Sequence, residues 1–319
     1  MSNLPRPQLG ELFSQWAWQP VAIVLAVVLG AWYLRAVHRL KGERWRARRT
    51  VMFLFGLAAL LWTSCGFLQA YSRSVFWVWT TQTLTLFLVV PMLLLAGQPL
   101  HLARVTSARA GWIDRFLASG IGRTLGNPLV GPALVPLASA GLFFGPLAGW
   151  AIASQPAGWV LQLVLLILGG LIALPLVDTD VDPSSLAVGL SLAIGSFELV
   201  LDAVPGIALR LHTTLATGYF DHRIAHVWTP NALHDQQLAG SILWVLAELI
   251  DLPFLLIVYR RWLRADARDA AAADAILDAE RAARGALPGT AEPPDTDVPW
   301  WVSDPAMQAR LQRNERNQD

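Results

Sequence analysis

The chain contains seven apolar runs, each close to the length of about 20 residues that a helix needs to cross a bilayer. Hydrophobic residues make up 55% of the chain and charged residues only 15%, whereas soluble domains carry about 25% charged residues. We therefore predict an all-α, polytopic membrane protein with seven transmembrane helices. The predicted spans are residues 19–37, 51–71, 76–96, 128–153, 159–177, 186–209 and 238–259.

Basic residues are concentrated after the first, third and last of these spans, in segments 35–49, 104–123 and 260–268. Because loops rich in Lys and Arg stay in the cytoplasm, this pattern predicts an outside N-terminus and a cytoplasmic C-terminus. The first 16 residues lack the basic start and the cleavage site of a signal peptide, so the first apolar run is expected to be retained.

We expect two parts, a transmembrane domain at residues 1–264 and a cytoplasmic tail at residues 265–319. The tail begins with an Ala-, Asp-, Glu- and Arg-rich stretch that is typical of a solvated helix. Residues 287–298 are rich in Pro and acidic residues, which is typical of disorder. The tail is therefore predicted to be partly helical and then disordered.

The last span carries two acids, Glu248 and Asp251, and the sixth carries Glu198 and Asp202. An acid at mid-membrane costs about 2.5–3.5 kcal/mol, so we expect these side chains to face the interior of the bundle. In the last span the acids continue a polar stripe with a spacing of 4, 3, 4 and 3, formed by Gln237, Ser241, Trp244, Glu248 and Asp251. Two interpretations remain open: a polar path for a cation or proton, or protonated acids that hold helices together.

The segment between the last two spans, residues 212–237, is rich in histidine. His222 and His226 are four residues apart and on a helix could bind one metal ion, with His234 as a further candidate ligand. Imidazole suits copper, zinc or nickel. Alternatively, the histidines only solvate a loop and Asp235 caps the last helix. The sequence has no glycine-rich phosphate loop, nucleophile elbow or paired-cysteine motif.

Several motifs resemble the CtaG-type cytochrome c oxidase assembly factors. They are VPMLLLAGQP at residues 90–99, DQQLAG at 235–240 with Trp244, RWLRAD at 261–266 and Asp182-Pro183. The resemblance implies a seven-span bacterial plasma-membrane protein that helps a terminal oxidase to mature, with copper delivery as the proposed role. The family's third-span histidine pair corresponds to Trp79 and Thr83 here, and a fifth-span histidine corresponds to Gln162.

We therefore expect a non-enzymatic factor that assists assembly or copper loading of a heme–copper oxidase and acts with oxidase subunits or other assembly factors. A transporter using the intramembrane acids, or a scaffold that binds no metal, are the alternatives. Membrane lipid is an expected partner and nucleic acid is not. The predicted polar site consists of Gln82, Glu198, Asp202, Asp235, Gln237, Glu248 and Asp251, with copper as a possible ion at His222, His226 and His234.

Overall fold

The computed structural model describes residues 9–40, 45–106, 111, 115, 119–120, 130–177, 185–216 and 231–285. Within these ranges the regular secondary structure is helical and contains no strand, which confirms the predicted all-α class. The chain divides into two compact units, Met1–Trp262 and Leu263–Asp319, and the site described below lies in the first.

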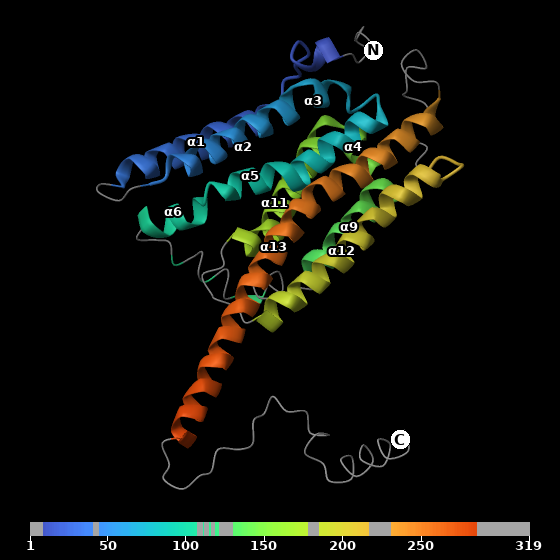
Figure 1. Cartoon of the computed structure of the whole chain (residues 1–319). Coiled ribbons are helices and arrows are strands. Elements are labelled where there is room, and N and C mark those ends of the chain that lie inside the picture. The colour runs from blue at the N-terminus through green and yellow to red at the C-terminus, as the bar shows by residue number, and fades with distance from the viewer. Residues whose placement is uncertain are drawn as a thin grey trace, which may run out of the picture. The chain divides into compact units, whose positions relative to one another are not determined.

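The first half of the chain forms apolar helical segments interrupted by short breaks (Figure 1). Its elements are η1 (Leu9–Leu12), α1 (Pro20–Arg39), α2 (Ala47–Cys65), α3 (Phe67–Tyr71), α4 (Phe76–Leu84), the π-helical turn η2 (Thr85–Val89), α5 (Val90–Ala96) and α6 (Pro99–Thr106). Gln19 caps α1, because its side-chain oxygen accepts a hydrogen bond from the Ala22 amide, and Pro20 presets a helical φ at the first position.

The second half has longer helices. They are α9 (Val130–Phe143), α10 (Leu147–Ala153), α11 (Gln155–Val177), α12 (Ser185–Leu211) and α13 (Ala232–Gly285). Asn231 caps α13, since its Oδ1 accepts a hydrogen bond from the His234 amide at 2.7 Å. α12 packs beside α9, and α11 packs against α5 and η2.

Five helical segments among the described residues are long and apolar enough to cross a membrane: Pro20–Arg39, Ala47–Tyr71, Phe76–Ala96, Gln155–Ala173 and Val188–Leu211. They correspond to the first, second, third, fifth and sixth predicted spans. The seventh predicted span lies within α13, where several side chains fall outside the described set. The number of seven spans and the orientation therefore remain predictions.

The fourth predicted span, 128–153, is not one straight helix. The structure has Leu134–Phe143 and Leu147–Ala153, bent by 60° with respect to each other. The break contains Gly145, where a Cβ atom would lie 2.5 Å from the Gly141 carbonyl oxygen, and Pro146, which has no N–H to continue a helix. If this pair crosses the membrane as one broken span, the candidate spans number up to 6.

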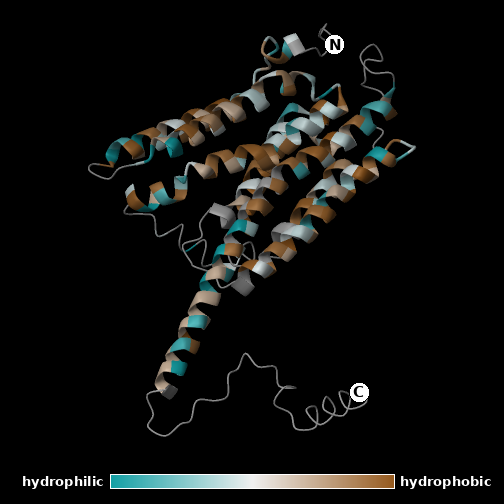
Figure 2. Ribbon diagram, viewed as in Figure 1, coloured by the Kyte–Doolittle hydropathy of each residue, from teal (hydrophilic) through white to brown (hydrophobic). Residues whose placement is uncertain are grey.

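The third apolar segment, Phe76–Ala96, is the most enclosed of the five. In its most apolar window 61% of the residues are buried, against 22% for Pro20–Arg39 and Gln155–Ala173, so it occupies the centre of the packed helices. Large apolar side chains such as Val28, Phe55 and Ile167 are exposed on the outer helices. Figure 2 shows apolar residues along the lengths of the packed helices and polar residues near many of their ends and along the last part of α13; a bundle surrounded by lipid is expected to have apolar residues along its spans.

A π-helical turn allows α11 to approach this central segment closely. In η2 the hydrogen bond that closes the turn runs from the Val90 amide to Thr85 O, and Pro91 has no N–H to donate to Phe87 O. A Cβ atom on Gly169 of α11 would lie 1.7 Å from Phe87 O and 2.9 Å from Pro91 Cγ. Only glycine fits at this contact, which fixes α11 beside the polar face of α4.

Candidate functional site

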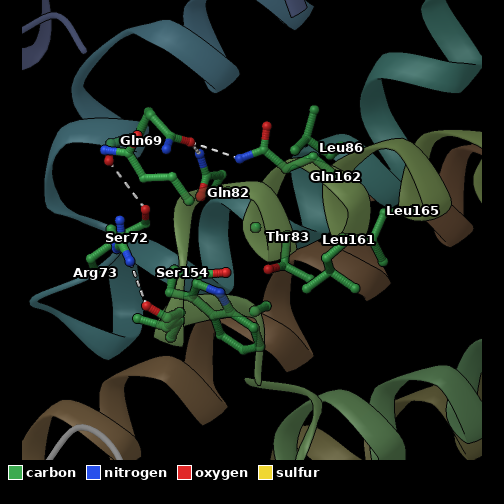
Figure 3. Close-up of a pocket in the computed structure, with 15 residues that line it drawn as sticks. Gln69, Ser72, Arg73, Gln82, Thr83, Leu86, Ser154, Leu161, Gln162 and Leu165 are labelled. Carbon is green, nitrogen blue, oxygen red and sulfur yellow. Dashed lines mark hydrogen bonds between the residues drawn. The ribbon is translucent and has the colours of Figure 1, made fainter. Parts of the chain in front are cut away.

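A small pocket lies between α3–α4 and α10–α11 (Figure 3). The space open to the centres of water molecules is about 30 Å³, and one water requires about 10–15 Å³ by that measure. Polar side chains from α3, α4, α11 and the connections after α3 and α10 line it: Gln69, Ser72, Arg73, Gln82, Thr83, Ser154, Gln155 and Gln162. The pocket is therefore a polar, water-sized site within an otherwise apolar bundle.

Helical spacing explains how the two long walls of the pocket form. On α4 and η2 the lining residues are Trp79, Gln82, Thr83 and Leu86, and on α11, after Gln155 at its first position, they are Gly158, Leu161, Gln162 and Leu165. Both sets follow intervals of 3, 1 and 3 residues, which place them on one helical face. Because α11 packs against η2 and α5, the two faces meet.

Four glutamines form a continuous hydrogen-bonded chain, which we call the amide chain. Gln69 Oε1 accepts hydrogen bonds from Gln82 Nε2 at 2.6 Å and from Gln162 Nε2 at 2.7 Å, as Figure 3 shows. Gln82 Nε2 also donates to Thr63 O at 3.0 Å, and Gln19 Nε2 donates to Gln162 Oε1 at 2.9 Å. The amide chain thus connects the start of α1 with α3, α4 and α11.

Two further contacts, one polar and one aromatic, lie beside the amide chain. Arg73 Nη2 donates a hydrogen bond to Ile152 O at 2.6 Å, which joins the loop after α3 to α10. Trp79 is buried and packs edge-to-face against Phe143, with ring centroids 5.5 Å apart. The first contact holds α10 to the loop after α3, and the second holds the end of α9 against α4, so the bent fourth segment forms one side of the site.

Asp235 lies at the first turn of α13, but its side chain caps α4. Its Oδ2 accepts a hydrogen bond from the Phe76 amide at 2.7 Å, and its Oδ1 accepts one from the Trp77 amide at 3.1 Å. The side chain is completely buried. The interpretation that Asp235 caps its own helix is therefore wrong, since Asn231 has that role. Asp235 instead links the last predicted span to the third, one turn before the pocket residue Trp79.

Burial raises the pKa of the Asp235 carboxyl above its ordinary value, whereas the two backbone N–H groups and His234 act in the opposite direction. The two amides still favour the charged form, because they sit at the positive end of the α4 dipole. The protonation of this buried carboxyl is therefore coupled to the hydrogen bonds at the first turn of α4.

Its neighbour Gln236 is equally buried and was not anticipated. Gln236 Oε1 accepts a hydrogen bond from the Ala216 amide at 2.7 Å, and its Nε2 donates to Thr214 O at 3.0 Å. It therefore fixes the chain that follows α12. The predicted residue Gln237 is only half-buried, and its side chain has no hydrogen bond with a described residue. The spacing of the apolar positions in α13 could have identified the right glutamine, because Gln236 shares a face with Ala232, Ala239 and Leu243.

Among the described side chains, the polar stripe of the last predicted span lies at the margin of the buried face of α13, and the expectation that both acids face the interior of the bundle stays a prediction. The buried face in this part of the helix is formed by Ala232, Asp235, Gln236, Ala239, Gly240, Leu243 and Ala247. Glu248 is half-buried, and Trp244 is 39% exposed. The side chain of Asp251 lies outside those described. In α12, Asp202 is buried and Glu198 half-buried, and no acid lines the pocket.

The proposed metal ligands are not brought together by the part of the chain that the structure describes. His222 and His226 lie outside the described residues, and His234 is exposed. Among the described residues no group of three or more His, Cys, Asp or Glu side chains could hold a metal ion. The pocket offers amides, hydroxyls, an indole and one guanidinium. Copper prefers imidazole and sulfur ligands, so the pocket does not fit copper.

Gln69 and Gln19 are members of the amide chain that the sequence analysis did not single out. Each is a lone amide at the boundary of an apolar run, and this position is a signal that could have identified both. By contrast, the resemblance to CtaG-type factors named Trp79, Gln82, Thr83 and Gln162, and the structure places all four around one pocket.

Comparison with known proteins agrees with these features. The family model for the cytochrome c oxidase caa3 assembly factor (Caa3_CtaG) matches residues 31–265. Uncharacterised proteins of Mycobacterium bovis and Mycobacterium tuberculosis are each 27% identical over 297 residues, which cover 88% of this chain and 44% of theirs. A Mycobacterium leprae protein, also uncharacterised, is 25% identical over 292 residues, or 86% of this chain and 44% of its own.

The chain therefore spans less than half the length of these curated relatives. No solved structure matches it significantly. The family model covers well over half of the chain and includes residues 82–100 and 235–265, which carry nearly all of the two longer stretches on which the resemblance rests. The chain belongs to the cytochrome c oxidase caa3 assembly factor family.

Proposed function

We propose that this protein is an integral protein of the bacterial plasma membrane that assists assembly of a respiratory heme–copper oxidase and catalyses no reaction itself. Its partners are oxidase subunits or other assembly factors. The family membership supports the role in oxidase assembly, and the long apolar helices with exposed apolar faces support the membrane location.

The observation that carries the proposal is the convergence of Trp79, Gln82, Thr83 and Gln162 on one pocket. The resemblance to the family singles out these positions in two spans that lie far apart in the sequence. Gln82 and Gln162 are joined through Gln69 by bonds of 2.6 and 2.7 Å. An arrangement of this kind depends on the whole bundle, which makes the pocket the best candidate for the family's shared role.

Copper loading, as a finer proposal, is assigned to the histidines of segment 212–237 and not to the pocket. The pocket contains no imidazole, thiol or thioether, whereas His222, His226 and His234 supply three imidazoles in one short segment. We expect the purified protein to contain copper, and the triple variant H222A/H226A/H234A to lose it. The single variant H38A, at the other end of the bundle, serves as control.

A scaffold that binds no metal is the second candidate, and the amide chain favours it. The amide chain links four helical segments with neutral hydrogen bonds and leaves no described carboxylate or imidazole facing the pocket. Copper at background level in both the wild type and the triple variant would contradict copper loading and support the scaffold, provided that oxidase assembly still depends on the protein.

The assembly role is tested by deletion of the gene and complementation. Deletion should lower oxidase activity and the absorbance of assembled haem in isolated membranes, and the wild-type chain should restore both. Gln69→Leu should restore them poorly, because two amide N–H groups lose their acceptor, at about 1–3 kcal/mol for each buried donor left unpaired.

Gln15→Leu is the matched control for this variant. Gln15 donates only to Glu11 in the segment before α1, and neither residue lines the pocket. This variant should therefore complement like the wild type. Unchanged oxidase activity after gene deletion would refute the proposed function.

A further inference from the structure

An aromatic and basic cluster lies where α1 ends and α2 and α6 begin. Trp45 Nε1 donates to the Tyr33 hydroxyl at 3.3 Å, and this hydroxyl donates to Gly97 O at 2.8 Å. The Arg49 guanidinium lies 4.7 Å from the centroid of the Trp45 ring. The His101 ring stacks on the same indole at 6.0 Å and an angle of 15°. Trp45 is therefore held in place from several sides.

Arg49 lies over this indole, and Arg46 and Arg48 lie next to Trp45 and Arg49 in the sequence. Arg39, Arg46 and Arg48 are exposed, and none of them forms an ion pair with a described carboxylate. Arg48 and Arg49 occupy the first turn of α2, which has no acidic residue and no side-chain cap. Like charges at the positive end of a helix dipole repel each other and the dipole. An anion placed among these guanidinium groups would remove that repulsion.

The arginines continue directly into exposed apolar surface. On α2, Arg48, Val51 and Phe55 have a helical spacing of 3 and 4 residues, and Val51 and Phe55 are 57% and 59% exposed. On α1, Arg35 follows Trp32 by three residues, and both are exposed. On each helix, a guanidinium near the helix end is therefore followed, on the same face and one to two turns toward the middle of the helix, by exposed apolar surface.

We propose that the cluster around Trp45 binds one anionic phospholipid, with its phosphate among Arg46, Arg48 and Arg49 and its acyl chains along the exposed faces of α1 and α2. The proposal rests on the membrane location given under Proposed function, but not on a role in oxidase assembly. Guanidinium groups bind phosphate through paired hydrogen bonds. An acidic protein segment would satisfy the charges but would leave Val51 and Phe55 uncovered.

Native mass spectrometry of the purified full-length chain in neutral detergent tests this proposal. The probe is phosphatidylglycerol, and phosphatidylcholine with the same acyl chains serves as the neutral comparison. We expect one phosphatidylglycerol to bind saturably and about tenfold or more tightly than phosphatidylcholine, since each basic residue near an anionic lipid contributes about 1 kcal/mol, or roughly fivefold. The variant R48Q/R49Q should lose this preference.

The matched control is R281Q/R284Q, which removes the same amount of charge from the last part of α13. It should keep the preference, and R48K/R49K should keep part of it. Equal binding of the two lipids, or equal loss in both double glutamine variants, would overturn the proposal. Displacement of the bound lipid by millimolar inorganic phosphate would also overturn it, because the acyl chains would then make no contribution. Since the readout is lipid binding, it can fail while the effect of gene deletion on the oxidase remains.

Discussion

At the scale of single residues, Asp235 connects two parts of the chain that are 159 positions apart. Replacement by alanine leaves the buried Phe76 and Trp77 amides without an acceptor, and each such loss costs about 1–3 kcal/mol. Asp235→Ala should therefore lower the midpoint of thermal unfolding in detergent. Asp235→Asn should lower it less, because one oxygen remains to accept a hydrogen bond. The control is His234→Ala, which removes an exposed neighbour. Equal midpoints for all three variants would contradict a capping role.

The raised pKa of Asp235 adds a dependence on pH. Because burial raises this pKa, the folded chain binds the proton more tightly than the unfolded chain does. The contribution of the carboxyl to stability is therefore greatest below its unfolded-state pKa and decreases as the pH rises through the raised folded-state value. Asp235→Asn has no such titration. The unfolding midpoint of the wild type, taken relative to that of Asp235→Asn, should fall as the pH rises above the ordinary pKa of an aspartate, about 4.

Sequence reasoning identified Asp235 but not its contact. The motif at residues 235–240 marks this acid, and a buried polar residue at a helix start indicates a cap. The local pattern predicted that Asp235 caps α13, whereas its carboxylate oxygens accept hydrogen bonds from the first turn of α4. A contact over such a separation depends on the packing of the bundle and has no signature in local spacing. Gln82 and Gln162 were named from the resemblance, whereas the position of Gln69 marks it only as a lone amide, and its hydrogen bonds to both of them are visible only in the folded chain.

At the scale of helices, Gly169 sets the distance between α11 and the central segment. A methyl group there would overlap Phe87 O, which lies 1.7 Å from the ideal Cβ position. Gly169→Ala should destabilise the fold by about 1–3 kcal/mol, the usual cost of overpacking, and should disturb the pocket because Gln162 lies on the same helix. The measurement is thermal unfolding together with complementation of oxidase activity.

The adjacent Gly170 is the matched control, because a Cβ atom there meets nothing within 4 Å. Gly170→Ala should be neutral or slightly stabilising, since alanine favours a helix by about 0.8–1.0 kcal/mol over glycine. If the two variants behaved alike, the close approach of α11 to η2 would not be a constraint on the fold.

The apolar runs predicted most helical segments well, because the length and hydropathy of a span are local properties. The third segment, residues 76–96, begins and ends where it was predicted. The π-helical turn at Thr85–Val89 was not predicted, since it forms where Pro91 removes a backbone donor and Gly169 admits the neighbouring helix. The 60° bend in the fourth segment was also missed, although Gly145 and Pro146 are its local signal.

The positions of the acids on α12 and α13 allow the transporter alternative to be tested. Glu198 and Glu248 are only half-buried, and the pocket is lined by other residues. We therefore expect Glu198→Gln and Glu248→Gln to leave cation and proton uptake into proteoliposomes at the background level shown by the wild type. Uptake by the wild type that either substitution abolished would establish transport and contradict the assembly-only role.

At the scale of the whole molecule, the amide chain and the Asp235 cap connect the elements that form the site. Gln19 joins the start of α1 to α11, and Asp235 joins α13 to the start of α4. Segments from both ends of Met1–Trp262 therefore meet around the pocket. The geometry of the site therefore depends on contacts between segments that are far apart in the sequence.

The orientation of the bundle and the seventh span can be tested together, because the chain has one cysteine, Cys65, and it is buried. In a Cys65→Ser background, single cysteines are placed at Ser14, Ala47, Thr213 and Ala271, all exposed positions. The positive-inside rule puts the arginine-rich start of α2 in the cytoplasm. A membrane-impermeant maleimide should therefore label Ser14→Cys and Thr213→Cys in spheroplasts, and Ala47→Cys and Ala271→Cys only in inverted vesicles.

The pair Thr213 and Ala271 decides whether α13 crosses the membrane, because these residues lie before and after residues 238–259. Labelling of both positions from the same side would show that α13 does not span, and the acids Glu248 and Asp251 would then need no shelter from lipid. Labelling of Ala47→Cys in spheroplasts would reverse the orientation of α2 and would place the arginine cluster around Trp45 in the outer leaflet. The expected pattern requires an odd number of crossings between Ser14 and Ala271, which agrees with seven spans only if the bent pair and α13 both cross the bilayer.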